Sequence, residues 1–220
     1  MYEPNFCRVL LAGSPMPILP ITTYKRFSKF LEKRIASSQH LTEDSVRYAF
    51  FYAVMQSTSI KQHELILELP HPNFPGKEID TYVAATKDRA ELFFEFKFHR
   101  ASRSQSGKPQ KAGSLFKDVS RLASLHSNGR RCAVIYLTCP EMAEYFDGHE
   151  DSYSAFWSQP ANSKFDYNEA FLTKTTETFR KESGELHPAC VHVEFSKALA
   201  RGYHLRIFDV QAIGQRGQGQ

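Results

Sequence analysis

The 220-residue chain has only four cysteines, at positions 7, 132, 139 and 190, and none has the C-x-x-C spacing of a zinc or redox motif. We therefore expect neither a disulfide scaffold nor a structural zinc site. Low cysteine content is typical of reducing compartments, so we expect a cytoplasmic protein. No apolar run approaches the ~20 residues that a membrane-spanning helix needs. The apolar stretch at residues 9–12 is too short for the core of a signal peptide.

Several catalytic motifs are also missing. The sequence contains no G-x-S-x-G nucleophile elbow, no G-x-x-x-x-G-K-[ST] phosphate loop and no H-E-x-x-H zinc motif. Glycine and proline, at 11 residues each, are too few for a fibrous or low-complexity chain. The length suits one domain, which we place at residues 1–213. Residues 214–220 consist of glycine, glutamine and one arginine, and we expect them to be a disordered tail.

Hydrophobic periodicity predicts four helices and six strands. The helices are expected at 22–35, 42–54, 114–125 and 168–181, and the strands at 64–69, 77–85, 91–98, 132–137, 191–195 and 204–210. Residues 140–168 have no regular pattern beyond short helical pieces. Three successive strands, a crossover helix and a buried strand predict an α/β fold, in which a mixed central β-sheet is flanked by helices.

The strands at 77–85 and 91–98 are separated by a polar turn at 86–89, which predicts a hairpin. Each strand has one apolar face and one face with ionisable side chains. Symmetric pairing about the turn places Asp80 opposite Glu95, with their Cβ atoms about 4.5–5.5 Å apart. Two facing carboxylates repel each other, and a divalent cation such as Mg²⁺ is one way to offset that repulsion.

Lys97 shares the ionisable strand face with Glu95. Its ammonium group could lie beside an attacking water or beside a phosphate in its charged transition state. The alternative interpretation is a solvated strand face, because a Glu-x-Lys triplet is common in chains of this size. The same register places Glu78 opposite Lys97, which would form an ordinary cross-strand ion pair. The residues alone leave both interpretations open.

Asp80, the short hairpin and Glu95-Phe96-Lys97 together resemble the PD-(D/E)XK motif of nucleases with the restriction-endonuclease-like fold. The predicted order of helix, three strands, helix and strand over residues 41–137 is similar to the core of that family, and residues 168–211 would add a helix and two strands. Ile79 stands where the family motif often has proline. The resemblance implies a restriction-endonuclease-like fold and a metal-dependent endonuclease that hydrolyses DNA phosphodiester bonds. It also implies a Mg²⁺ cofactor, for which Mn²⁺ would substitute.

The resemblance implies roles for four catalytic residues. Asp80 and Glu95 would bind the metal. Lys97 would position the attacking water or stabilise the phosphoryl charge. Glu43, at the start of the second predicted helix, would complete or tune the metal shell. The alternative for Glu43 is that it only complements the helix dipole, a role that Asp44 would serve equally well.

Residues 96–117 contain no acidic residue. The basic residues of this segment and of the helix that follows are candidates for DNA-backbone contacts, namely Arg100, Arg103, Lys108, Lys111, Lys117 and Arg121. The predicted loop at 100–113 would grip the backbone and set affinity rather than sequence preference. The alternatives are a solvated basic loop and, for Arg121, a simple i, i+3 ion pair with Asp118.

The net charge of +4 permits an anionic partner without requiring one. The partner we expect is double-stranded DNA, and cutting both strands with one active site per chain would favour a two-fold homodimer. Two alternatives stay open: a catalytically inactive nucleic-acid-binding protein with the same fold, and an RNA-directed hydrolase.

Overall fold

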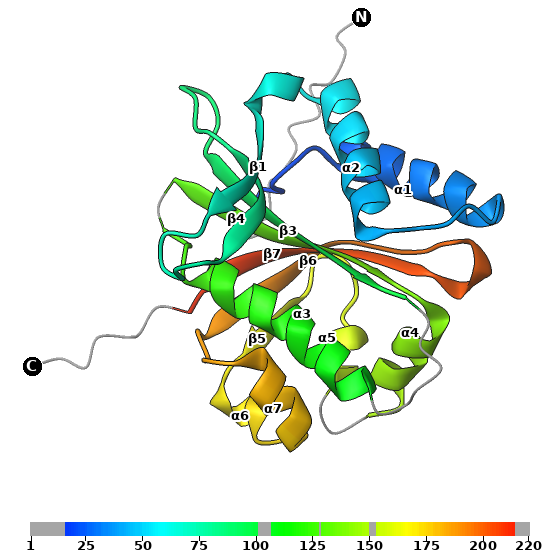
Figure 1. Ribbon diagram of the computed structural model, residues 1–220, viewed down its shortest axis with the longest axis vertical. Helices are drawn as coiled ribbons and strands as arrows, with labels where there is room; N and C mark the ends of the chain where they lie inside the picture. The colour runs from blue at the N-terminus through cyan, green and yellow to red at the C-terminus, as the bar shows by residue number, and fades with distance from the viewer. Residues whose placement is uncertain (1–15, 101–106, 128, 150–152, 214–220) are drawn as a thin grey trace, which may run out of the picture.

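The computed structural model describes residues 16–100, 107–127, 129–149 and 153–213. A seven-stranded sheet in the order β1-β2-β3-β4-β7-β6-β5 runs through its centre, with helices on both faces (Figure 1). The sheet is mixed, because β3 and β4 are parallel and the other neighbouring strands are antiparallel. This confirms the predicted α/β class. The strands are β1 Leu65–Pro70, β2 Glu78–Val83, β3 Glu91–His99, β4 Arg130–Thr138, β5 Lys164–Tyr167, β6 Ala189–Ala198 and β7 His204–Ala212.

Two hydrophobic cores lie on the two faces of the sheet. α1 (Ile21–Ala36) and α2 (Glu43–Ser57) cover one face. The other face carries α3 Lys108–Ala123, α4 Pro140–Asp147, α5 Tyr153–Trp157, α6 Glu169–Leu172 and α7 Glu177–Ser183. β4 contributes to both cores, because its successive side chains point alternately to each face. It is therefore the doubly buried strand that its continuous apolar sequence predicts.

The hairpin of β2 and β3 has the predicted register. The paired residues are Thr81 with Phe94, Tyr82 with Phe93 and Val83 with Leu92. Asp80 and Glu95 come next in the same register. β3 then leads into α3, which crosses over one face of the sheet before the chain returns as the parallel strand β4.

The boundaries of α3 differ from the prediction. The helix begins at Lys108 rather than near Ser114, and its N-cap Gly107 provides no side-chain hydrogen bond. Pro109 lies in the first turn, where proline is tolerated because the first amides of a helix have no intrahelical acceptor. Lys108 and Lys111 therefore belong to the helix and not to a loop. Arg103 lies outside the described residues.

The C-terminal half contains two further differences. Residues 168–181 form two short helices, α6 and α7, because Asn168 and Thr176 each cap a separate start: their side chains accept hydrogen bonds from the amides of Phe171 and Phe179. β5 is an additional strand within the segment that lacks a regular pattern. It pairs with β6 at the edge of the sheet.

Among the described cysteines, Cys132, Cys139 and Cys190 have free thiols. Cys7 and the predicted tail at 214–220 lie outside the described residues. Within the described parts of the chain, no helix combines the length and the apolar character that crossing a membrane requires.

Candidate functional site

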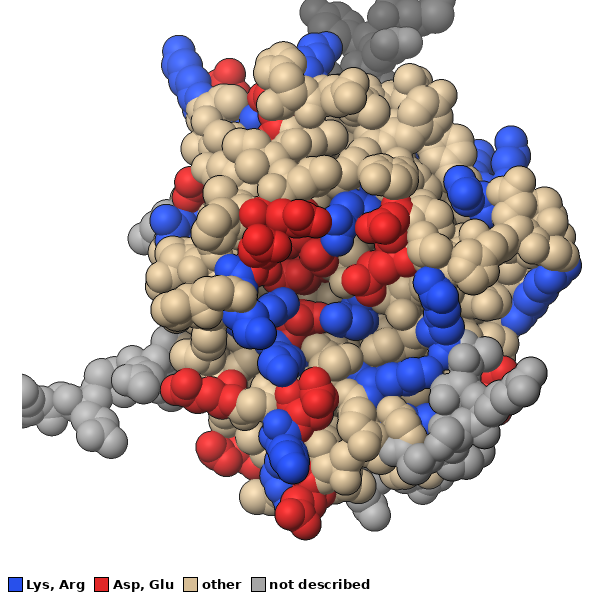
Figure 2. Space-filling view, viewed as in Figure 1, with Lys and Arg blue, Asp and Glu red and all other residues tan. Residues whose placement is uncertain are grey.

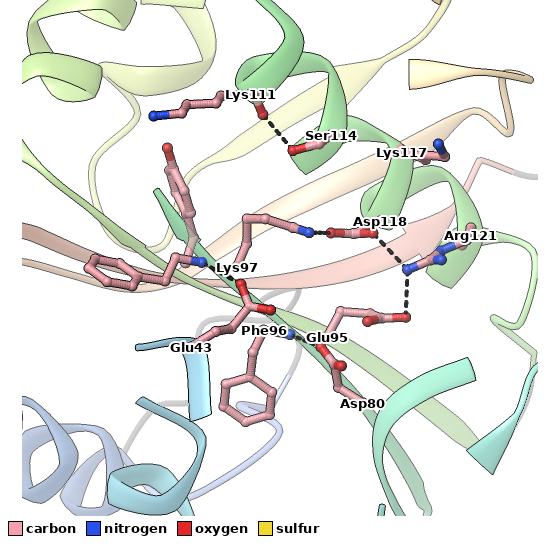
Figure 3. Close-up of polar contacts among 12 residues, drawn as sticks. Glu43, Asp80, Glu95, Phe96, Lys97, Lys111, Ser114, Lys117, Asp118 and Arg121 are labelled. Atoms are coloured by element: carbon pink, nitrogen blue, oxygen red, sulfur yellow. Dashed lines mark hydrogen bonds and ion pairs between the residues drawn. The ribbon is translucent and has the colours of Figure 1, made fainter. Parts of the chain in front are cut away.

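Charged side chains from α2, β2, β3 and α3 converge between α2 and α3. Figure 2 shows acidic and basic side chains gathered near the middle of this face of the molecule, and Figure 3 shows how they contact one another. The set, which we call the Glu95 cluster, comprises Glu43, Arg47, Asp80, Glu95, Lys97, Asp118 and Arg121. It brings together all four residues that the sequence predicts to be catalytic, and adds Arg47, Asp118 and Arg121 to them.

β3 and α3 face each other in matched steps. Strand side chains on one face recur every two residues, which spans about 6.6 Å, and helix side chains recur every three or four residues, which spans about 4.5–6 Å. Residues 95, 97 and 99 of the strand can therefore meet residues 121, 118 and 114 of the helix in turn. The contacts are Glu95–Arg121 at 3.1 Å, Lys97–Asp118 at 2.7 Å and His99–Ser114 at 3.3 Å.

Glu43 is placed by the capped start of α2. The Thr42 hydroxyl accepts a hydrogen bond from the Ser45 amide at 3.0 Å, and the Ser45 hydroxyl accepts one from the Thr42 amide at 2.8 Å. This capping box fixes the first turn of the helix. The Glu43 Oε2 atom then accepts a hydrogen bond from the Phe98 amide at 2.9 Å. Burial raises the pKa of Glu43, although Lys97 and the Phe98 amide oppose the rise. Glu43 therefore contacts the strand that carries Glu95 and Lys97, which a residue serving only the helix dipole would not do.

Asp80 lies where the backbone pairing of β2 and β3 ends, since the last paired residues of the hairpin are Thr81 and Phe94. The Asp80 Oδ2 atom accepts a hydrogen bond from the Phe96 amide at 2.7 Å. Its Oδ1 atom lies 2.8 Å from the Arg47 Nη2 atom. The Asp80 carboxylate thus takes the place of a backbone partner for β3 and also carries an arginine counterion.

Glu95 is the most deeply buried carboxylate of the cluster, with 3% of its side chain exposed. Burial, followed by the neighbouring carboxylates of Asp118 and Asp80, raises its pKa well above the usual range, and Arg121 opposes only part of this rise. The proximity of Asp80 and Glu95 that the hairpin register predicts is therefore present, together with the expected electrostatic cost. A buried carboxyl with a raised pKa next to like charges is a feature of functional sites.

Lys97 pairs with Asp118 and not with Glu78. Its Nζ atom lies 2.7 Å from the Asp118 Oδ2 atom, and 22% of the lysine side chain is exposed. Burial alone would lower the pKa of Lys97, but the carboxylates of Asp118, Glu43 and Glu95 together raise it above its ordinary value. Lys97 is therefore positively charged at neutral pH. The cross-strand pair with Glu78 that the sequence left open does not form.

Two members of the cluster were not predicted from the sequence. Arg47 lies one helical turn after Glu43, and this i, i+4 spacing was the available signal, because it places both residues on one face of α2. Asp118 does pair with Arg121 at 2.7 Å, as its i, i+3 spacing indicates. That local explanation left no reason to expect its contact with Lys97, which depends on how α3 packs against β3.

The six basic residues proposed for DNA contacts lie in different surroundings. The Arg121 guanidinium contacts the carboxylates of both Glu95 and Asp118. Lys117 is 3.7 Å from Glu182 of α7, and Lys108 is buried. The Lys111 Nζ atom donates a hydrogen bond to the Arg100 carbonyl at 2.8 Å. The Arg100 side chain itself is exposed, whereas Arg103 is not described.

Oxygen atoms of Asp80, Glu95 and Glu43 are the donor type that Mg²⁺ prefers, and two neighbouring carboxylates are chemically suited to a divalent cation. In the structure, the guanidinium groups of Arg47 and Arg121 supply positive charge to these carboxylates. The Arg47 Nη2 atom lies 2.8 Å from the Asp80 Oδ1 atom, and the Arg121 Nη2 atom lies 3.1 Å from the Glu95 Oε1 atom. Among the described residues, no group of three or more acidic, histidine or cysteine side chains is arranged to hold a metal ion. The carboxylate oxygens of Asp80, Glu95 and Glu43 are nevertheless chemically suited to Mg²⁺. To bind there, the ion would have to replace the contacts of Arg47 with Asp80 and of Arg121 with Glu95.

Comparison of the chain with protein-family models, with curated proteins and with solved structures gives no match. The function of the Glu95 cluster is therefore inferred from its own residues and geometry.

Proposed function

We propose that the protein is a Mg²⁺-dependent deoxyribonuclease with a restriction-endonuclease-like fold, which hydrolyses DNA phosphodiester bonds as an endonuclease. The observation that carries the proposal is the placement of two neighbouring carboxylates, Asp80 and Glu95, beside a charged and partly exposed Lys97. Four carboxyl groups and three cations make up the Glu95 cluster, so its formal charge is −1 when all four carboxyl groups are ionised.

Each residue has a role that follows from its position. Asp80 and Glu95 would hold the metal, and Glu43 would complete or tune its shell from the start of α2. When bound, Mg²⁺ would lower the pKa of a water molecule and offset charge on the leaving oxygen. Lys97 would stabilise the phosphoryl charge or orient the attacking water, since its ammonium group is kept charged next to the carboxylate pair. Asp118 would hold that ammonium group in place.

Arg47 and Arg121 would act as counterions that keep the carboxylates neutralised until the metal binds. Breaking a buried ion pair leaves an uncompensated charge. An arginine whose carboxylate partner binds the metal therefore needs another anion as its partner. The phosphate of the substrate is the anion that arrives at the same site. Metal binding and substrate binding would therefore support each other in this cluster.

The proposed partner is DNA, and Arg100 and Lys111 are the described basic residues near the end of β3 that lie outside the Glu95 cluster. A phosphate backbone attracts such cations without regard to sequence. A two-fold homodimer on double-stranded DNA stays a prediction.

The test is incubation of the protein with plasmid, linear duplex, single-stranded DNA and RNA, each with Mg²⁺ or with EDTA. We expect hydrolysis of DNA in Mg²⁺ only, and its loss in Lys97→Ala. Lys174→Ala is the matched control, because Lys174 is an exposed lysine of the C-terminal half. Identical behaviour of wild type and Lys97→Ala on every substrate would contradict catalysis by this cluster. Hydrolysis of RNA alone would assign the protein to an RNA-directed hydrolase.

A catalytically inactive nucleic-acid-binding protein is the second candidate, and one observation favours it: Arg47 and Arg121 already neutralise Asp80 and Glu95. Salt-sensitive DNA binding without turnover in either Mg²⁺ or Mn²⁺ would support this candidate. In that case neither Lys97→Ala nor wild type would hydrolyse nucleic acid, whether Mg²⁺ or Mn²⁺ is present.

A further inference from the structure

A cavity of about 340 Å³ lies at the end of β3, the strand that carries Glu95 and Lys97. This volume falls at the lower end of the range of roughly 300–1,000 Å³ that is usual for small-ligand sites. Three segments distant in sequence line it: the end of β3, the residues after α1 and the connection between β6 and β7 (Figure 1). The lining residues used below are Ser38, Phe98, Arg100, Arg201 and Tyr203.

Phe98 joins the cavity to the Glu95 cluster. Its side chain lines the cavity, while its backbone amide donates a hydrogen bond to Glu43. Lys97 is the preceding residue of the same strand, and one strand residue spans about 3.3 Å. The Lys97 and Phe98 side chains point to opposite faces of β3, so the cavity and the Glu95 cluster meet at the backbone of this strand, where Glu43 accepts the hydrogen bond of the Phe98 amide.

The cavity is positively charged. Arg100 and Arg201 line it, and no acidic residue is found among its described lining residues. The Arg201 guanidinium donates hydrogen bonds to the Ala36 carbonyl, at 3.2 Å, and to the Ser38 hydroxyl. These partners are neutral, so they orient the guanidinium without cancelling its charge. Arg100 lies over the Phe98 ring, with its Cζ atom 5.9 Å from the ring centroid. One oriented and one exposed guanidinium group suit a phosphate.

The cavity also has aromatic walls. The Phe98 and Tyr203 rings are 6.3 Å apart between centroids and are inclined at 33°. Both side chains are half-buried, so part of each ring remains accessible. Aromatic rings next to cationic side chains are the combination by which proteins hold unpaired nucleotides, with the base on a ring and the phosphate on the cations.

Two residues of the cavity wall have φ angles in the left-handed region, Ser38 at 59° and Arg201 at 57°. Ser38 ends α1 in the usual way, since the amides of Ser38 and Gln39 donate hydrogen bonds to the carbonyls of Ile35 and Arg34. Arg201 lies in the tight connection between β6 and β7. The hydrogen bond between their side chains joins these two segments at the cavity.

We infer that this cavity binds one unpaired nucleotide of a nucleic-acid strand, next to the phosphate that the Glu95 cluster would cleave. This inference rests on the proposed nuclease function and narrows its substrate class. The phosphate contacts Arg100 and Arg201, and the base lies against Phe98 and Tyr203. A paired base inside a duplex cannot reach these rings unless it leaves the stack. Single strands, frayed ends and flaps are therefore the favoured substrates.

The test is the binding of a fluorescein-labelled single-stranded thymidine octamer, followed by anisotropy in EDTA at several salt concentrations, with the corresponding duplex as a second probe. We expect tighter binding of the single strand. Arg100→Gln and Arg201→Gln should each weaken it by about tenfold, and should lower the slope of log affinity against log salt by roughly 0.7, the value for one phosphate contact on a single strand. Tyr203→Leu should weaken binding without changing that slope, because stacking involves no counterion release.

Two controls keep the result interpretable. Lys174→Gln removes an exposed positive charge that does not line the cavity, and this variant should bind the octamer as wild type does. Arg201 has a strained backbone and structural hydrogen bonds, so thermal unfolding of Arg201→Gln is measured in parallel. Arg100→Gln carries the test if Arg201→Gln unfolds, because the Arg100 side chain is exposed. Single-strand affinity that is unchanged in both Arg100→Gln and Tyr203→Leu, or a preference for duplex, would overturn the inference.

The binding assay contains no metal and measures no hydrolysis, so its failure differs from failure of the nuclease proposal. Loss of binding in the cavity variants without hydrolysis by wild type would leave the cavity assignment standing and contradict the nuclease. Hydrolysis by wild type together with unchanged binding in the cavity variants would support the nuclease proposal and contradict the cavity assignment.

Discussion

Two clusters of buried carboxylates with arginine partners lie on this sheet, and they differ in what their carboxylate oxygens contact. In the Glu95 cluster, the carboxylates lie beside one another and beside Lys97. The second set, which we call the Asp209 cluster, comprises Asp209, Glu194, Arg131 and Tyr24. Its Glu194 accepts hydrogen bonds from the Ile18 amide, at 2.8 Å, and from the Tyr24 hydroxyl. The Asp209 cluster thus ties the start of α1 to the sheet.

The clusters differ in the exposure of one carboxylate. Asp80 keeps 22% of its side chain exposed, whereas the Glu194 and Asp209 side chains are 7% and 1% exposed. Glu95, at 3%, is as buried as those two, and the cations Lys97 and Arg131 are alike, at 22% and 24%. Burial of a carboxylate beside arginine is therefore not in itself a sign of catalysis. A reactive site also needs an accessible edge and a charged group such as Lys97 that a substrate can reach. Variants of the Glu95 cluster should accordingly lose activity, and variants of the Asp209 cluster should lose stability.

The largest effect is expected for Lys97→Ala. Removing a group that stabilises charge in the transition state costs about 10²–10³ in kcat, which corresponds to about 2.7–4 kcal/mol. Initial rates of plasmid nicking at saturating DNA measure this, with Lys174→Ala as the control. A fall in rate that is accompanied by an equal fall in the folded fraction would place Lys97 with the structural residues and erase the difference between the clusters.

The second effect concerns the Asp209 cluster. Arg131→Leu should lower the free energy of unfolding by about 3 kcal/mol, because it leaves Asp209 and Glu194 buried without a cation. Urea denaturation measures the change, and the nicking rate per folded molecule should be unaltered. The neighbouring Arg130→Leu is the control. Arg130 is 40% exposed and pairs with Glu91, so its loss should cost no more than about 1 kcal/mol. Equal losses in the two variants would contradict the structural role of the Asp209 cluster.

A smaller effect is expected for Asp118→Asn, because Asp118 acts through Lys97. The nicking rate should fall about tenfold, or roughly 1.4 kcal/mol, when the ammonium group loses its anionic partner. Asn keeps the shape of the side chain, so the KM for DNA should stay near the wild-type value while kcat falls. Asp88→Asn, in the exposed hairpin turn, is the control. A change confined to KM would assign Asp118 to DNA binding and not to the positioning of Lys97.

The last effect concerns the pH dependence of stability. Folding raises the pKa values of Glu95 and Glu43, so the folded state binds more protons than the unfolded state above the ordinary carboxyl pKa. The free energy of unfolding should therefore decrease as pH rises through that window, by roughly 1.4 kcal/mol for each unit of raised pKa. Glu95→Gln should flatten this decrease between pH 5 and pH 8, and the exposed Glu78→Gln should not. A Glu95→Gln profile parallel to that of wild type would show that Glu95 is not titrating in this way.

Much of the site was predictable from local sequence. The polar turn at 86–89 and the alternation of the flanking strands define the hairpin register, and that register places Asp80 next to Glu95. The capping box at Thr42 likewise fixes where Glu43 stands at the start of α2. In both cases residues that are close in sequence, or mirror-related about a turn, determine the geometry.

Contacts between distant segments were not predictable in this way. The pairing of Lys97 with Asp118 depends on how α3 lies against β3, and the i, i+3 pair of Asp118 with Arg121 gave a sufficient local explanation. The start of α3 was placed too late because Gly107 provides no side-chain cap and Pro109 reads as a loop residue. β5 is defined by its pairing with β6, and its four residues are too few to show the alternation that predicts a strand from the sequence.

The most direct measurement compares plasmid hydrolysis by wild type and by Glu95→Gln, in Mg²⁺ and in EDTA. Gln keeps the size of the side chain and a hydrogen-bond acceptor for Arg121, but removes the charge that a metal requires. The account predicts nicking by wild type in Mg²⁺ alone and no nicking by Glu95→Gln in either condition, with both proteins folded. Equal nicking by the two proteins in Mg²⁺, or equal nicking by wild type in EDTA, would contradict it.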